Sequence, residues 1–168
     1  DASSTGGTNA NRWSNTAPTT AIINLGSGNS VNRSSSNYIA YCFAEKQGYS
    51  HFGQYKGNNN SDGPFIYTGF KPAWVMIKRV DSTGNWYIYD TERNGASGPN
   101  TNQAHKILYA NDSSGEVVNT DRGIDMIAHG FKIRNTLGDV NADDGTYVYA
   151  AFASSPFVSS AGVPTTAR

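Results

Sequence analysis

The amino-acid sequence predicts an all-β fold, an antiparallel β-sandwich. Leucine occurs only at positions 25, 108 and 137, and the runs of Ala, Leu, Glu and Lys that build helices are missing. Aromatic and β-branched residues dominate the apolar set, and Gly, Asn and Ser interrupt them at intervals of roughly 8 to 12 residues, the usual strand spacing of a sandwich. No window shows apolar residues at sustained helical spacing, so we expect two sheets packed face to face.

The first predicted strands lie between residues 38 and 68. Residues 38–44 (YIAYCFA) follow a run of Ser and Asn, residues 49–55 (YSHFGQY) end at a cluster of Gly, Asn, Ser and Asp, and residues 65–68 form a short strand. Aromatic and β-branched runs bounded by turn-forming residues are typical of strands. Cys42 is the single cysteine and lies in the first of these runs. We therefore expect a buried, unreactive thiol there.

A hairpin is predicted in the middle of the chain. Residues 73–80 and 85–90 flank a four-residue loop that ends at Gly84, as in common hairpins. Alternation along the first strand predicts two faces, Trp74, Met76 and Lys78 on one and Val75, Ile77 and Arg79 on the other. Because both faces are partly apolar, we expect this strand to lie inside a layered sandwich. The later predicted strands are residues 105–109, 125–127, 130–134 and 146–153.

The sequence contains an internal repeat. Residues 31–44 match residues 140–153 position by position, with Val, Asn, Tyr, Phe and Ala recurring at equivalent places. Repeats usually bury one another's apolar faces. Because the second copy has far more chain in front of it, we expect residues 1–36 to be the C-terminal portion of a first repeat. The missing strands would come from an upstream part of the parent polypeptide or from a neighbouring subunit.

This interpretation sets the expected domain organisation. Residues 37–157 form the second repeat and the main sandwich, and residues 158–168 form a flexible or partner-bound tail. The chain begins at Asp1 rather than Met, so we expect a processed product or the ordered part of a longer protein.

The charge balance excludes some classes of protein. Thirteen basic and thirteen acidic residues give a formal net charge of zero, whereas nucleic-acid modules and polybasic membrane-surface proteins need an excess of basic residues. No apolar run approaches the roughly 20 residues that span a bilayer. We expect neither nucleic-acid binding nor membrane insertion.

Two groups of acidic residues are candidates for a metal site or a catalytic site. The segment from Asp139 to Gly145 resembles a calcium loop, but Asp144 and Ala150 stand where an EF-hand needs Gly and Glu. Asp90 and Glu92 lie two residues apart at the end of a predicted strand, and a glycosidase uses a pair of carboxylates. A polar turn and solvated strand-end charges are the interpretations we favour. We therefore expect no metal, no cofactor and no catalytic residue.

The aromatic residues of the central hairpin are the candidate ligand site. Aromatic faces beside amide and carboxylate groups bind sugars, and the same residues also anchor sandwich cores and subunit contacts. Pleating places Trp86 and Tyr87 on opposite faces, so at most one of them lines a given surface. The candidate glycan-binding residues are Trp74, Trp86, Tyr87, Tyr89 and Asp90.

Longer motifs run through the predicted strands. They are YIAYCFAE (38–45), GYS (48–50), DGPFIYTGF (62–70), PAWVMIK (72–78), WYIYD (86–90), GFKIR (130–134) and YVYAAFASSPF (147–157). Together they resemble a domain family of tailed bacteriophages, especially marine ones, over about residues 13–157. The resemblance implies a tail-fibre or other virion-surface protein with a lectin-like, concanavalin-like jelly-roll sandwich.

From these observations we expect a non-enzymatic virion structural protein, in a tail fibre, an appendage or a capsid decoration. Its partners would be other virion subunits, including copies of itself, held by strand-edge pairing and aromatic contacts. The alternative is a carbohydrate-binding adhesin that recognises host surface glycans. A depolymerase fragment is a third hypothesis, from the class of enzymes.

Overall fold

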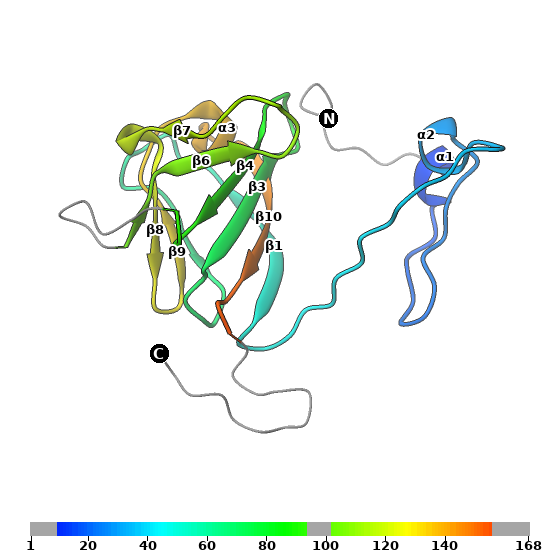
Figure 1. The fold of residues 1–168 in the computed structure, drawn as a ribbon, viewed down its shortest axis with the longest axis horizontal. Helices are drawn as coiled ribbons and strands as arrows, with labels where there is room; N and C mark the ends of the chain where they lie inside the picture. The colour runs from blue at the N-terminus through cyan, green and yellow to red at the C-terminus, as the bar shows by residue number, and fades with distance from the viewer. Residues whose placement is uncertain (1–9, 94–101, 156–168) are drawn as a thin grey trace. The chain divides into compact units, whose positions relative to one another are not determined.

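The computed structural model describes residues 10–93 and 102–155 (Figure 1). The chain divides into two compact units between Phe43 and Ala44, later than the boundary expected after residue 36. We call residues 10–43 the N-terminal unit and the described residues from 44 to 155 the sandwich unit, and each is described by itself. The predicted tail, residues 158–168, lies outside the described residues.

The sandwich unit consists of two antiparallel sheets. The six-stranded sheet has the order β1 (Ser50–Lys56), β10 (Thr146–Phe152), β3 (Trp74–Arg79), β4 (Trp86–Asp90), β6 (Lys106–Tyr109) and β7 (Val117–Val118). The four-stranded sheet has the order β2 (Phe65–Tyr67), β9 (Gly130–Ile133), β8 (Ile124–Ile127) and β5 (Gln103–Ala104). The expected all-β sandwich is therefore confirmed.

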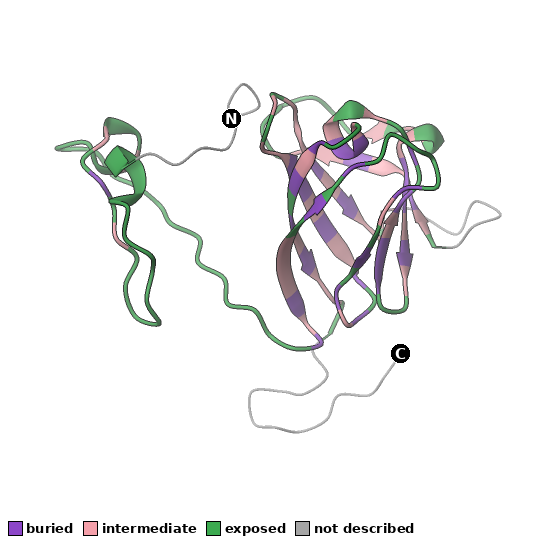
Figure 2. Ribbon diagram, turned by 180° about the vertical axis from the view of Figure 1, so that it is seen from behind, coloured by how far each residue is buried: buried purple, intermediate pink, exposed green. Residues whose placement is uncertain are grey.

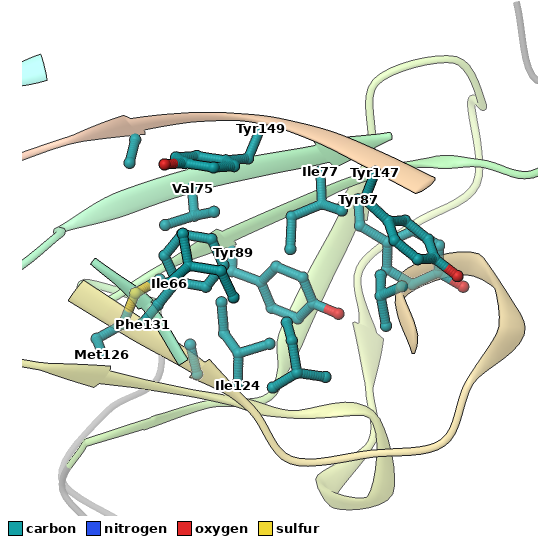
Figure 3. Packing of buried hydrophobic residues seen from close by; sticks show 14 of the residues in the cluster. Ile66, Val75, Ile77, Tyr87, Tyr89, Ile124, Met126, Phe131, Tyr147 and Tyr149 are labelled. Carbon is teal, nitrogen blue, oxygen red and sulfur yellow. The ribbon is translucent and has the colours of Figure 1, made fainter. Parts of the chain in front are cut away.

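The core lies between the two sheets and follows the two-residue side-chain period of the strands. Val75 and Ile77 point inward from β3 and are fully buried, whereas Trp74 and Met76 are only half-buried on the other face. Figure 3 shows these inward side chains meeting those of the four-stranded sheet. The register predicted for the central hairpin is confirmed, because β3 pairs with β4 from Trp74 opposite Asp90 to Lys78 opposite Trp86.

One predicted strand is wrong. Residues 38–44 form no strand, and among them Ile39 and Tyr41 are each 81% exposed. Cys42 is exposed rather than buried. A strand is stable only when a neighbour satisfies its backbone groups, and no strand pairing among the described residues includes residues 38–42. The two-residue strands β5 and β7 were not predicted, since so short a segment carries no alternation.

The N-terminal unit contains short elements. Helix α1 (Ala10–Trp13) is followed by a turn in which the Thr19 amide donates to the Ile22 carbonyl at 2.9 Å, and then by helix α2 (Asn29–Asn32).

In the sandwich unit, a 3₁₀ turn, η1 (Thr120–Arg122), precedes β8, and helix α3 (Gly138–Asn141) lies between β9 and β10.

Asn141 is the polar centre of the sandwich unit. Its side chain is fully buried, accepts a hydrogen bond from the Asn58 amide at 2.9 Å, and donates to the carbonyls of Asn60 at 2.9 Å and Asn135 at 2.7 Å. These bonds tie the β1–β2 loop and the chain after β9 to α3. Because buried polar groups are stable only when they are paired, one amide side chain fixes three segments.

We expect Asn141→Ala to lower the free energy of unfolding by about 1–3 kcal/mol, because it leaves buried backbone groups unsatisfied. The matched control is Asn32→Ala, at the equivalent position of the repeat, where the side chain is exposed and the change should stay within about 0.5 kcal/mol. Urea denaturation followed by tryptophan fluorescence measures both. Equal effects of the two substitutions would contradict the assignment of Asn141 as the polar centre.

Candidate functional site

The outer face of the six-stranded sheet carries a continuous apolar row. Strand pairing places five side chains next to one another across β1, β10, β3, β4 and β6. They are Phe52, Ala150, Met76, Ile88 and Leu108, and all are half-buried. We call these five residues the outer row. Figure 2 shows the alternation of buried and half-buried positions along these strands.

Aromatic rings extend this face at one end of the sheet. The Phe152 ring lies 5.7 Å from the Phe52 ring and 5.6 Å from the Trp74 ring, centroid to centroid. At the other end, Trp86 pairs across the strands with Lys78, and burial lowers the pKa of the Lys78 ammonium. The middle of this face is therefore apolar, with aromatic residues towards both ends and with Lys78 and Asp90 beside them. An apolar centre with a polar rim is the composition of protein contact surfaces.

Two of the predicted ligand residues lie in the core instead. Tyr87 and Tyr89 are 1% and 0% exposed, so neither ring offers a face to a sugar, and for these two residues the predicted site is wrong. Their hydroxyls donate to a carboxylate oxygen of Asp139 and to the Arg122 carbonyl, each at 3.0 Å. Both rings are inward positions of β4, and burial raises the pKa of both hydroxyls. Trp74 and Trp86 remain on the outer face.

Asp90 belongs to an ion-pair chain. Its carboxylate accepts hydrogen bonds from the backbone amide of Arg93, at 2.8 Å, and from the Arg93 guanidinium, which also binds Glu116 at 3.0 Å. Glu92 between them is exposed. The Asp90 carboxylate is thus engaged by an arginine, as expected for a strand-end charge.

The acidic turn before β10 is held by protein partners. Asp139 accepts the Tyr87 hydroxyl, and Asp144 pairs with the Lys56 ammonium at 3.0 Å. Within residues 10–93 and 102–155, no group of three or more His, Cys, Asp or Glu side chains is placed to hold a metal ion.

The sequence did not predict that residues 38–42 would be exposed. Aromatic and β-branched residues predominate in this segment, as in a strand, yet Tyr38, Ile39 and Tyr41 are 46%, 81% and 81% exposed. This composition predicts that a segment forms a strand, but it does not say whether the partner strand lies in the same chain. Only the repeat pointed to a partner elsewhere.

The fold and these surfaces define a two-sheet β-sandwich domain with a half-buried apolar row on the outer face of its six-stranded sheet. The DUF7483 family, described as a domain of unknown function, matches residues 1–156, and the chain belongs to this family. Comparison with curated proteins and with solved structures finds no match. Over the residues that the structure describes, no helix has the length and apolar character to cross a membrane.

Tyr149 illustrates how burial tunes the tyrosines of the core. Its ring packs 5.3 Å from the Phe131 ring, and its hydroxyl oxygen lies 2.8 Å from Nδ1 of His51. Burial raises the pKa of Tyr149 to about 12 from the ordinary value of 10.0, with a smaller contribution from Glu45. The neutral phenol is thus the form that the folded state favours.

We expect the folded state to lose stability as the pH rises above 10. Because the folded pKa of Tyr149 lies above the unfolded value, its contribution is complete below pH 10 and is lost as the pH rises towards 12. Tyr149→Phe should make the decline shallower, by at most about 1.4 kcal/mol per pH unit. The measurement is urea denaturation at a series of pH values, with Tyr41→Phe, at an exposed position, as the control. A slope unchanged by Tyr149→Phe would contradict this.

Proposed function

We propose that this chain is a non-enzymatic structural domain of a bacteriophage virion surface, in a tail fibre, an appendage or a capsid decoration. It assembles with other virion subunits and with copies of itself through β-sheet and aromatic contacts. The virion-surface location rests on the sequence motifs that resemble those of tailed bacteriophages. The assembly role rests on the apolar surfaces of the domain.

The outer row is the main support for the proposed assembly role. It crosses five strands without an intervening charge and continues into the aromatic group of Phe52, Phe152 and Trp74. Contiguous apolar patches on a monomer are usually contact sites. The Asp90 and Glu116 carboxylates near this face are both paired with Arg93, which favours a structural role over hydrolysis.

Met76→Lys tests this role at the middle of the outer row. A lysine there should dissociate the oligomer, because its ammonium would be buried without a counter-ion in the contact. Sedimentation equilibrium over a range of protein concentrations measures the oligomeric state, and circular dichroism checks that the fold is kept. Tyr67→Lys is the control, since Tyr67 is 65% exposed on the other sheet and the oligomer should persist.

A wild-type chain that stays monomeric at every concentration would contradict assembly through the outer row. An oligomer that survives Met76→Lys and dissociates with Tyr67→Lys would move the contact to the four-stranded sheet, and would contradict it equally.

A carbohydrate-binding adhesin is the second candidate, favoured by the two half-buried tryptophans on the outer face. Stacking of a sugar on Trp86 predicts that Trp86→Ala abolishes binding to host polysaccharide, whereas Trp13→Ala, at an exposed tryptophan of the N-terminal unit, does not. Binding is measured by retention on immobilised polysaccharide, whose chain length should stay unchanged. Absence of binding by the wild-type chain removes this candidate, and shortened polysaccharide would favour a depolymerase.

A further inference from the structure

The same hydrogen-bonded motif occurs twice in the chain. In the sandwich unit, the Tyr147 hydroxyl donates to the Gly138 carbonyl at 2.6 Å and accepts from the Ala142 amide at 2.7 Å. In the N-terminal unit, the Tyr38 hydroxyl donates to the Asn29 carbonyl at 2.6 Å and accepts from the Arg33 amide at 2.9 Å. These six positions correspond one to one in the repeat that the sequence shows, so the two copies share a structure as well as a pattern.

The backbone around the motif also corresponds. Each copy has a four-residue helix that ends in Val-Asn, α2 in one and α3 in the other. A residue in the left-handed region follows at matching positions, Ser35 with φ of 60° and Asp144 with φ of 51°. A non-glycine residue there is uncommon, so its recurrence is specific.

The correspondence extends upstream of the helices. The turn closed by Thr19 and Ile22 precedes α2, as the turn between Ile127 and Gly130 joins β8 to β9 before α3. Helix α1 precedes that turn, as η1 precedes β8. The helix α1, the turn and the helix α2 thus follow one another in the order of η1, the β8–β9 turn and α3, although residues 10–43 form no strand.

The two copies differ in what surrounds their last segment. Strand β10 lies between β1 and β3, and its inward side chains Tyr147, Tyr149 and Ala151 are buried. Residues 38–42 form a plain trace rather than an arrow in Figure 1. The residues that correspond to these inward positions are Tyr38, Ala40 and Cys42, and all three are exposed. Asn32, the counterpart of the buried Asn141, is exposed as well.

We propose that residues 38–42 are the central strand of a second sandwich of this family, and that their partner is a sheet that has β1-type and β3-type strands but lacks its own last strand. A second copy of this chain does not meet that description, because its β10 already fills the position and is held there at high effective concentration by its covalent connection. This inference deepens the proposed function by naming the partner of one assembly surface.

The test uses the 168-residue chain as donor and a refolded acceptor of residues 44–135, which ends before α3 and β10. A peptide of residues 136–155 is the positive control, because it supplies the missing α3 and β10. We expect the chain to form a 1:1 complex with the acceptor on gel filtration. Cys42 is the only thiol of the chain and corresponds to the buried Ala151, so its reaction with a thiol reagent should slow at least tenfold in the complex.

Three donor variants make the test specific. Tyr38→Asp should abolish the complex, because it places a charge at an inward position. Ala40→Tyr should tighten it more than tenfold, because it restores the ring that Tyr149 packs against Phe131. Tyr41→Ala changes an outward position to the residue that β10 has there, Ala150, and should alter the affinity less than twofold.

An acceptor that binds the peptide but not the chain would overturn the proposal, as would a complex insensitive to Tyr38→Asp.

If the acceptor does not bind even the peptide, the reaction rate of Cys42 in the 168-residue chain alone tests the proposal. A Cys42 that reacts as fast as a free thiol in a small peptide supports the proposal. A protected Cys42 overturns it, since the sandwich unit covers it in a monomer and a second copy covers it in an oligomer. An oligomer that dissociates with Met76→Lys while the acceptor goes unbound refutes this inference and leaves the proposed function standing.

Discussion

Tyrosine hydroxyls of the six-stranded sheet hold the segment between β9 and β10 against the end of the core. Tyr55 donates to the Val140 carbonyl at 2.7 Å, Tyr147 to the Gly138 carbonyl at 2.6 Å, and Tyr87 to the carboxylate of Asp139 at 3.0 Å. The rings fill the core, and the hydroxyls pair with two carbonyls and one carboxylate of this segment. Figure 3 shows Tyr87 and Tyr147 lying together beside this segment. The position of β10, and so the order of the sheet, depends on this arrangement.

The same constraint explains why the sheet has two different faces. The inward side chains, among them the tyrosines with bonded hydroxyls, are buried in the core, so contacts with other molecules are left to the outer positions. Those positions carry the outer row and the aromatic group around Phe152. These outer positions are the surface through which we propose that the domain assembles.

Most of the sandwich unit could be predicted from sequence, because its strands are long enough to show alternation. The hairpin of β3 and β4 is the clearest case, since both its register and the inward direction of Val75 and Ile77 follow from pleating. The candidate site was less predictable. Tyr87 and Tyr89 have the residue type of a sugar platform, yet which face of β4 is covered depends on the second sheet, and local sequence does not specify that.

The failure at residues 38–44 has a different physical origin. The segment has the composition of a strand, and its Tyr38 hydroxyl makes the same two hydrogen bonds as the Tyr147 hydroxyl of β10. Strand formation nevertheless depends on partner strands far away in sequence. The repeat contains the motif but not the strands that pair with β10. Local pattern can therefore identify a strand-forming segment without establishing that the strand is paired.

Amide hydrogen exchange of the 168-residue chain tests most directly whether residues 38–42 are a strand separated from its sheet. Protection reports the hydrogen bonding and local stability of each amide. We expect strong protection in β10 and exchange near the unprotected rate at Ile39, Ala40 and Tyr41, although both segments follow the same motif. Protection of residues 39–41 equal to that of residues 148–150 in the isolated chain would contradict this expectation.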